Sequence, residues 1–250
     1  MQLSQLLTVL EGLLSTSEFL DYCPNGLQVE GKSQVQKLGF AVSASLATIE
    51  EAVKRGVDAL IVHHGIFWNK DAYPIIGTKK KKIEALLSAQ LSLLAYHLPL
   101  DAHREIGNNW KAARDLGWES LEPFLPQGKH FLGVKGIFKA RDVATFRQEL
   151  EAYYAHPAHV ALGGKKEVRR VALVSGGAHR SIDLAADEGV DCYVTGSFDE
   201  MIWDIAHERN IHFFALGHYA TERVGIHALM ELLQAQTGLS CEWIDLFNPF

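Results

Sequence analysis

The chain has 250 residues, of which 48% are hydrophobic and 22% charged, so it can bury a core of its own without disulfides or other cross-links. Its formal net charge of -6 argues against nucleic acid as a partner, because phosphate backbones bind clustered positive charge. Its three cysteines, Cys23, Cys192 and Cys241, share no CxxC spacing. This argues against a thiolate metal site and fits the reducing cytoplasm.

Leucines recur at helical spacing over residues 3–14, which predicts an amphipathic first helix. The first basic residue of the chain is Lys32, so this stretch lacks the positive start of a secretory signal. No run approaches the roughly 18 apolar residues of a membrane span. We therefore expect a cytoplasmic protein with no membrane partner.

Strands and helices alternate through the rest of the chain. The pattern predicts strands over 38–42, 58–62, 92–96, 171–174, 191–195, 212–216 and 241–246. It predicts helices over 45–55, 79–90, 179–188, 201–209 and 221–236. Such alternation is typical of an α/β fold with mixed, largely parallel sheets. The stretch 121–139, with two prolines and three glycines, is less regular, so we expect two units, 1–125 and 126–250.

The two halves of the chain are similar in sequence. Residues 43–62 and 175–194 each run from a turn that begins with serine, through a helix, to a Gly-Val-Asp strand entry. His97 precedes Asp101 by four residues, and His218 precedes Glu222 by four. We interpret this as an internal duplication that gives two related α/β units.

His63 and His64 follow directly on the apolar strand predicted over 58–62. Neighbouring side chains of a regular strand point to opposite faces, so the two can converge only where the strand ends, and Gly65 permits a turn there. The carboxyl ends of parallel strands are also where α/β sheets place ligands. Two interpretations of the dipeptide stay open: a metal site, or one histidine capping a helix while the other packs in the core.

Two carboxylates also follow predicted strand ends. Asp101 comes after Pro99 and before a helix, where an aspartate is more commonly a helix N-cap. Glu222 and His218 lie at a helix start. There the glutamate either stabilises the first helical turn or points with His218 at one site beyond the strand.

Together the three groups predict a metal centre. His63, His64, Asp101, His218 and Glu222 offer imidazole and carboxylate ligands and no thiolate, which suits Zn, Fe, Mn or Co. A single catalytic zinc ion usually takes three protein ligands, so five exceed its need. Because a carboxylate can bridge two cations, we predict two divalent transition-metal ions per chain, between the two units.

Two further motifs have weaker implications. Lys79 to Lys82 form a four-lysine run at a predicted helix start, which we interpret as a solvated face, with phosphate binding as the alternative. Ser175-Gly-Gly177 resembles a phosphate-binding turn before a helix, although it lacks the rest of a Walker or GxGxxG motif.

Five segments carry a resemblance to a known family: DYCPNGLQVEG, VDALIVHHGIFW, YHLPLDAH, GVDCYVTG and GHYATER. On these segments the chain resembles the Nif-three-like family, also known as type 2 homologues of GTP cyclohydrolase I, and in particular its short bacterial, YbgI-like members. The resemblance covers essentially the whole chain. It implies a dinuclear metal site on the same five residues and a ring-shaped homohexamer. The chain departs from the family at Ser197, where members often have an acidic residue.

The predicted metal centre also indicates a reaction class. We expect a metal-dependent hydrolase, because two divalent ions carry more charge than Asp101 and Glu222 neutralise and so favour a small anionic, phosphorylated or nucleotide-like substrate. His97 is the candidate catalytic residue, as a general base or as a residue that orients a ligand. The alternative is a non-enzymatic metal-binding scaffold or regulator. We expect Phe67 and Trp68 to be exposed and to contribute to oligomer contacts.

Overall fold

The computed structural model describes residues 1–250 and divides the chain into two compact units. The first unit comprises Met1–Leu100 and Ile226–Phe247, and the second comprises Asp101–Gly225 and Asn248–Phe250. The chain passes from one unit to the other within helix α4 (Leu98–Ala102) and again within helix α9 (His218–Thr237). These bounds differ from the predicted 1–125 and 126–250, because most of α9 and the last strand belong to the first unit.

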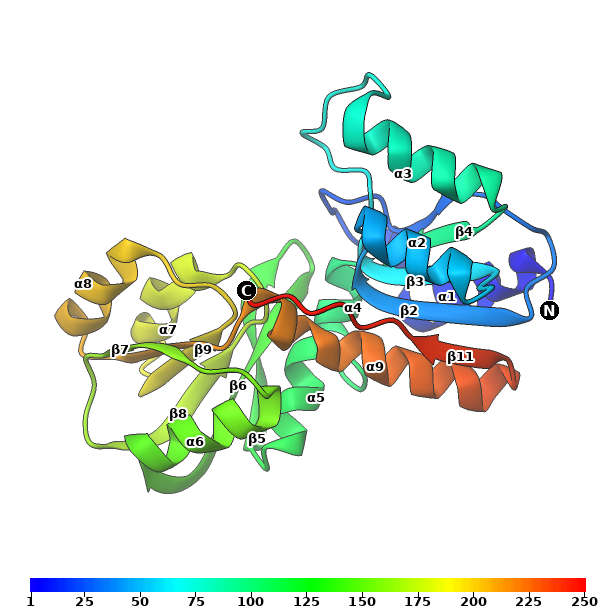
Figure 1. Ribbon diagram of the computed structural model, residues 1–250. Coiled ribbons are helices and arrows are strands. Elements are labelled where there is room, and N and C mark those ends of the chain that lie inside the picture. The colour runs from blue at the N-terminus through cyan, green and yellow to red at the C-terminus, as the bar shows by residue number, and fades with distance from the viewer. The chain divides into compact units, whose positions relative to one another are not determined.

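The first unit contains a five-stranded mixed sheet with strand order β1-β4-β3-β2-β11 (Figure 1). Its strands are β1 (Gly26–Val29), β2 (Lys37–Ser43), β3 (Ala59–His64), β4 (Ser92–Ala95) and β11 (Ser240–Trp243). Strand β1 pairs antiparallel with β4, and the other neighbours are parallel. Besides its share of α4 and α9, the unit has helices α1 (Leu3–Leu14), α2 (Leu46–Lys54) and α3 (Gly77–Ser88) and a 3-10 turn, η1 (Thr16–Glu18).

The core of the first unit explains why its strands are continuous apolar runs. Leu60, Ile61 and Val62 of β3 have no exposed surface, as expected for a parallel strand that is covered on both faces. Helix α2 contributes Ile49 and helix α3 contributes Leu86 to the same hydrophobic cluster. Helix α1 is confirmed as amphipathic, and it buries Leu3, Leu6, Leu10 and Leu14.

The second unit contains a six-stranded mixed sheet with strand order β5-β6-β8-β9-β10-β7 (Figure 1). Its strands are β5 (Glu119–Gln127), β6 (His130–Asp142), β7 (His159–Leu162), β8 (Glu167–Leu173), β9 (Cys192–Thr195) and β10 (His212–Ala215). Strands β8, β9 and β10 are parallel, and the remaining pairs are antiparallel. The unit has helices α5 (Asn108–Asp115), α6 (Val143–Tyr154), α7 (Ile182–Asp187) and α8 (Glu200–Glu208) and a 3-10 turn, η2 (His179–Ser181).

Helices cover both faces of the second sheet. Phe146 of α6 and Ala112 of α5 pack in one buried cluster, with Val171 of β8. Ile182 of α7 and Ile202 of α8 pack in another, with residues of the opposite face. The predicted α/β class with two mixed sheets is therefore confirmed.

The stretch 121–139 is a long antiparallel hairpin, and not the irregular boundary that we predicted. Strand β5 contains Pro123 and Pro126, and it lies at the edge of the sheet. An edge strand tolerates proline because one row of its N–H groups has no neighbouring strand to bond. The prolines therefore mark an edge strand here.

The two sheets repeat one substructure, in agreement with the predicted duplication. Asp58 and Asp191 each precede the middle strand of three parallel strands, β2-β3-β4 and β8-β9-β10. Each carboxylate accepts two backbone hydrogen bonds at the start of the preceding strand, Asp58 from Gln36 and Lys37 and Asp191 from Arg169 and Arg170, at 2.8 to 3.2 Å. The same contacts at equivalent positions of both units support the repeat.

The register of the repeat differs from the one that the His-x-x-x-acid spacing suggested. The backbone N–H groups of Tyr96 and Leu216 each donate to the corresponding carbonyl of the middle strand, at 2.9 Å in both units. His97 therefore corresponds to Gly217, and not to His218. The two histidine and carboxylate pairs therefore do not occupy equivalent positions of the repeat.

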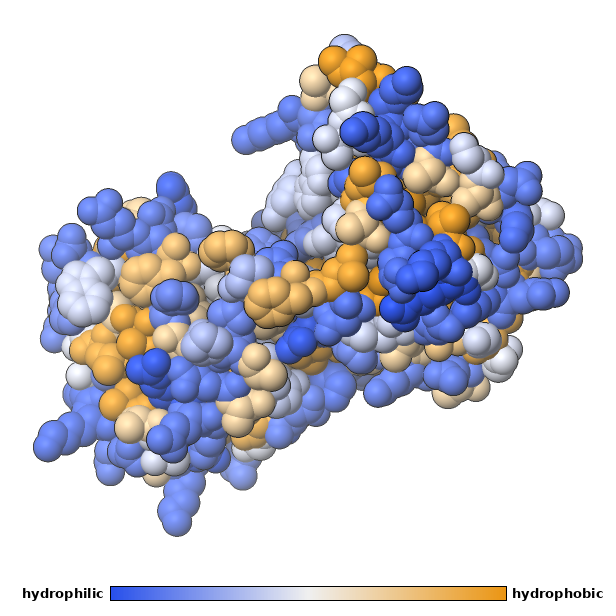
Figure 2. Space-filling model, viewed as in Figure 1, coloured by the Kyte–Doolittle hydropathy of each residue, from blue (hydrophilic) through white to orange (hydrophobic).

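The surface of the first unit corrects one expectation. Phe67 and Trp68 are half-buried and pack against the first-unit core. The large apolar side chains exposed near them are Tyr73, Ile75 and Ile76, in the loop between β3 and α3. On the face shown in Figure 2, hydrophobic residues lie in separate groups among hydrophilic ones.

None of the helices has the length and apolar character that crossing a bilayer requires.

The four-lysine run occupies the first turns of α3. Lys80 and Lys81 are exposed to solvent, as predicted for a solvated face. The Lys79 ammonium donates to the Ala72 carbonyl at 3.0 Å and lies over the Phe67 ring, so it fastens the preceding loop to the helix.

Candidate metal centre

His63 and His64 are the last two residues of β3. Their rings converge, with centroids 4.7 Å apart, although neighbouring side chains of a strand normally diverge. The chain then passes Gly65, where a β-carbon would stand 2.2 Å from the carboxamide oxygen of Gln28. Glycine is needed here for that close approach, and the Gln28 oxygen in turn accepts the Ile66 N–H at 2.9 Å.

The contacts of the pair define which ring nitrogen can bind a cation. His63 Nδ1 lies 2.9 Å from the Tyr96 carbonyl oxygen, which can only accept a hydrogen bond. Nδ1 therefore carries the proton and the lone pair lies on Nε2. His64 Nδ1 lies 3.0 Å from Ser43 Oγ, on the neighbouring strand β2. Metal-ligating histidines are commonly oriented by such a contact at the second nitrogen.

His97 lies two residues after the end of β4 and is held by the segment before β1. Its Nδ1 donates to Asp21 Oδ1 at 2.9 Å, and Asp21 Oδ2 accepts from Leu98 N and from Asn25 Nδ2, at 3.0 and 2.9 Å. Burial alone would raise the pKa of Asp21. The hydrogen bonds and the charge of His97 outweigh it and lower that pKa to about 2. An ionised Asp21 thus holds the Nδ1 side of the His97 ring in place.

His97 completes a group of three histidines in the first unit. One ring nitrogen each of His63, His64 and His97 lie within 4.8 Å of one another, a spacing that could hold a metal ion. Trp68 and Tyr22 meet the His97 ring edge-on, with centroids 5.4 and 5.0 Å away. The structure therefore brings the predicted ligands His63 and His64 together with His97, the candidate catalytic residue.

In the second unit, His218 and Glu222 share one face of the first turn of α9. His218 Nε2 lies 3.2 Å from Glu222 Oε1, and His218 Nδ1 lies 3.2 Å from Ser197 Oγ. Ser197, where the sequence departs from the acidic residue common in the family it resembles, orients the ring through its hydroxyl. Glu222 is buried, with 3% of its surface exposed.

Asp101 lies within α4 and is not a helix N-cap, which was the alternative interpretation of its position. Its Oδ1 accepts hydrogen bonds from Asn108 Nδ2 at 2.8 Å and from Ser175 Oγ at 3.0 Å. Asn109 holds Ser175 in position beside Asp101. Its Oδ1 accepts the Ser175 N–H at 2.6 Å, and its Nδ2 donates to the Leu132 carbonyl at 2.8 Å. The carboxylate is therefore held in one orientation by buried polar side chains.

The turn at Ser175-Gly-Gly177 links Asp101 to Glu222 and is not a phosphate-binding turn. The Ser175 and Gly176 N–H groups are already donated, to Asn109 Oδ1 and to Thr221 Oγ1. Gly176 has φ +67°, and a β-carbon there would stand 2.2 Å from Glu222 Oε1. Glycine lets the backbone pass close to the carboxylate.

The donors of each unit fit divalent transition metals. The first unit gathers three imidazoles, and the second gathers Asp101, His218 and Glu222 around the Ser175–Gly176 turn. All are nitrogen or oxygen ligands of the type that Zn, Fe, Mn and Co bind. The sequence singled out Ser175 and Ser197 without these contacts, and it did not indicate the supporting roles of Asp21, Asn108 and Asn109.

The fold and the site define the chain as an α/β protein with two related mixed sheets and clustered histidine and carboxylate donors. Comparisons with known proteins identify its family. The family model described as Duf34/NIF3 (NGG1p interacting factor 3) matches residues 1–248, and the chain belongs to this family. The "GTP cyclohydrolase 1 type 2 homolog" of Chlamydia trachomatis is 49% identical over the full length of both chains. The Escherichia coli K12 protein of the same name is 42% identical over 94% of each chain.

Solved structures agree. The structure described as "protein ybgI, unknown function" matches with a TM-score of 0.94 and 39% identity over all of both chains. Reduced HcgD from Methanocaldococcus jannaschii matches with a TM-score of 0.88 and 26% identity over 98% of each chain.

Proposed function

We propose that the chain is a cytoplasmic metal-dependent hydrolase in which His63, His64, Asp101, His218 and Glu222 bind two divalent transition-metal ions. The proposal rests most on the histidines of the first unit. The Nδ1 atoms of His63 and His97 donate to oxygen acceptors, and one ring nitrogen each of His63, His64 and His97 lies within 4.8 Å of the others. These contacts fix the ring orientations, so that His63 and His64 can bind a cation with His97 beside them.

The two carboxylates have different roles in this proposal. Asp101 Oδ1 is occupied by Asn108 and Ser175, so this side chain binds a single ion. Glu222 lies beside His218 with its carboxylate against the Gly176 backbone, and we assign to it the bridge between the ions.

The proposed substrate is a small phosphorylated or nucleotide-like molecule. When bound, two divalent ions polarise such a substrate and make a water molecule more acidic. Asp101 and Glu222 neutralise only part of the ions' charge, which favours an anion. His97 is the general base, because Asp21 holds its Nδ1–H and directs Nε2 toward His63 and His64.

Elemental analysis of protein purified without chelator tests the metal site. We expect close to two first-row transition ions per chain, and loss of both in the His63→Ala, His64→Ala double variant with its circular dichroism unchanged. His159→Ala is the matched control, because His159 is exposed on the edge strand β7. Wild-type protein that holds no metal and takes up none on addition would refute the site.

A substrate screen of the metal-loaded protein tests the reaction class. The panel contains nucleotides, GTP among them, and phosphoesters. His97→Ala should lower turnover about 10²- to 10⁴-fold with metal content intact, as expected for a general base. Metal loss in this variant would make His97 a ligand, and a metal-loaded protein inactive on the whole panel would favour a scaffold or regulator.

A further inference from the structure

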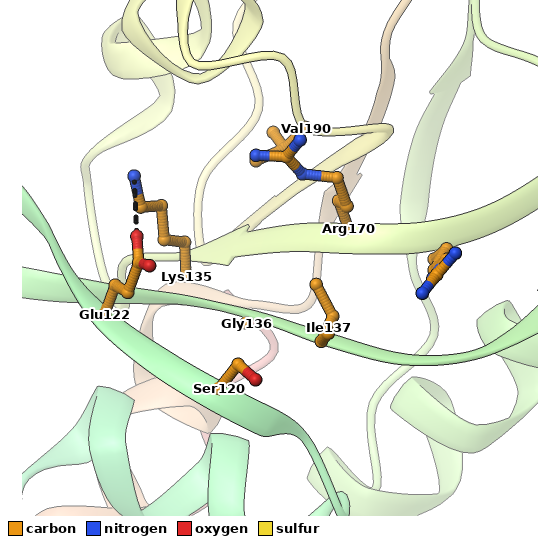
Figure 3. A pocket seen from close by; sticks show the side chains of 8 residues that line it. Ser120, Glu122, Lys135, Gly136, Ile137, Arg170 and Val190 are labelled. Carbon is orange, nitrogen blue, oxygen red and sulfur yellow. Dashed lines mark ion pairs between the residues drawn. The ribbon is translucent and has the colours of Figure 1, made fainter.

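The second unit contains a cavity that the proposed metal chemistry does not use. It has a volume of about 420 Å³, within the range of small-molecule sites. It lies beside the beginnings of β8 and β9, whereas Ser175, Ser197 and His218 follow the ends of β8, β9 and β10. The lining residues are Ser120 and Glu122 of β5, Lys135, Gly136 and Ile137 of β6, Arg169 and Arg170 of β8, and Val190 (Figure 3).

The cavity forms where two strand pairings are interrupted together. The β5–β6 register shifts between Glu119 and Glu122, and the β6–β8 register shifts between Ile137 and Arg141. Ser120 lies within the first irregularity and has φ +50°, a left-handed conformation that is uncommon for serine. Bulges and strained residues are over-represented beside functional sites, where they redirect side chains.

Two cations on one face of the sheet point into this space. Arg170 pairs in register with Ile137, two residues after Lys135, so the three side chains share a face. Figure 3 shows the Lys135 and Arg170 side chains extending on the same side, with Val190 beside the guanidinium. Arg169, the next residue of β8, adds a third positive charge to the lining.

The cations differ in how far they are neutralised. Lys135 forms ion pairs with Glu188 and, at 3.2 Å, with Glu122, and these partners raise its pKa. The guanidinium groups of Arg169 and Arg170 form no hydrogen bond or ion pair with the protein. Their contacts are made by the backbone: both N–H groups donate to Asp191 Oδ2, and the Arg170 carbonyl accepts the Asp191 N–H at 2.8 Å. Both arginines are exposed, so their charges are open to a ligand from solvent.

We infer that this cavity binds a small organic anion through Arg170, with Lys135 and Arg169 as secondary contacts. The guanidinium offers a planar pair of donors that matches a phosphate or a carboxylate group. Ile137 and Val190 provide an apolar surface for the rest of the ligand. The inference is independent of the metal centre and of the reaction proposed for it.

Arginine modification on the wild-type protein tests where an anion binds. Phenylglyoxal adducts are mapped by mass spectrometry with inorganic phosphate, with succinate, or with neither, at constant ionic strength. At least one anion should slow modification of Arg170, and the anion that does so identifies the preferred group. Arg180, whose side chain is 75% exposed, is the internal control and should react at an unchanged rate. No protection of Arg170 by either anion would overturn the inference.

Calorimetric titration of three variants with the protecting anion gives a second test. Arg170→Gln should weaken binding about tenfold, the effect of losing one charge-assisted contact. Glu122→Gln should strengthen binding, about threefold at most, because it removes a competing carboxylate from Lys135. Lys129→Gln is the matched control, since it removes one positive charge from the exposed turn between β5 and β6. Equal effects of Arg170→Gln and Lys129→Gln would also overturn the inference.

Discussion

At the scale of single residues, Asp101 and Glu222 differ in what surrounds them. Asp101 receives two side-chain hydrogen bonds on one oxygen, from Asn108 and Ser175. Glu222 contacts His218 within its own helix and lies against the backbone of Gly176. The roles proposed for the two carboxylates can therefore be separated by isosteric variants.

The Glu222→Gln variant should lose more bound metal than the Asp101→Asn variant. If Glu222 bridges two ions, its loss leaves two cations repelling at short range, and more than half of the bound metal should be lost. Asp101→Asn should keep about one ion per chain, because water partly replaces a terminal ligand. Elemental analysis of both variants after identical purification measures this. Equal metal loss in the two would contradict the bridging role of Glu222.

Asn108 should contribute strongly to stability without being a ligand. Its side chain is fully buried, donates to Asp101, and accepts the Gly225 N–H of α9 at 2.6 Å. Asn108→Ala leaves both partners buried without that bond, so the free energy of unfolding should fall by about 1–3 kcal/mol. Urea titration checks this against Gln148→Ala, an exposed amide on α6 that should change it by less than about 0.5 kcal/mol. Equal effects would contradict the role of Asn108.

At the scale of elements, the repeated connection before the middle strands depends on one carboxylate in each unit. Asp58 accepts the N–H groups of Gln36 and Lys37, and Lys32 donates to it at 2.9 Å. Burial would raise the pKa of Asp58, but these contacts outweigh it and hold that pKa below its ordinary value. The stabilisation therefore exists above the unfolded pKa and is lost as pH falls through the lower folded pKa.

Asp58→Asn should destabilise the protein at pH 7 and much less in acid. At neutral pH the ionised carboxylate bonds to three donors, and we expect a cost of about 1–3 kcal/mol. As pH falls through the ordinary pKa of an aspartate toward the lower folded pKa, the wild type loses this stabilisation, so the difference between the two proteins should shrink. Denaturant unfolding from pH 7 to pH 3 measures it, with Glu50→Gln as an exposed control. A difference that stays constant with pH would rule out this source of stability.

The sequence predicts an element where neighbouring residues determine it, and does not predict a feature that depends on contacts between distant residues. The buried strand 59–64 reads as an apolar run, and the candidate ligands could be picked out because they follow such strands. The β5–β6 hairpin could not be predicted, because Pro123 and Pro126 are typical of a linker. They fit a strand here only because β5 lies at the edge of the sheet. Likewise, Ser175 contacts Asp101 from 74 residues away, which no local pattern indicates.

At the scale of the whole molecule, the loop before α3 exposes large apolar side chains that a monomer would leave in contact with water. Tyr73, Ile75 and Ile76 are 97%, 55% and 71% exposed, and they follow one another within four residues. Large apolar side chains that gather on a surface commonly mark a protein contact. The homohexamer predicted from the resemblance and this loop lead to the same expectation of assembly.

Light scattering should therefore give the wild-type protein a mass that is a multiple of the 27.8 kDa chain, with a hexamer expected. The Ile75→Asp, Ile76→Asp double variant should shift the mass downward, because it places two charges in a contact that would exclude water. Lys139→Glu, an exposed change in the second unit, is the control and should leave the mass unchanged. A stable 27.8 kDa wild type at micromolar concentration would contradict assembly itself. An oligomer that the double variant leaves intact would assign the contact to other surfaces, because two buried charges at an interface could not be tolerated without loss of affinity.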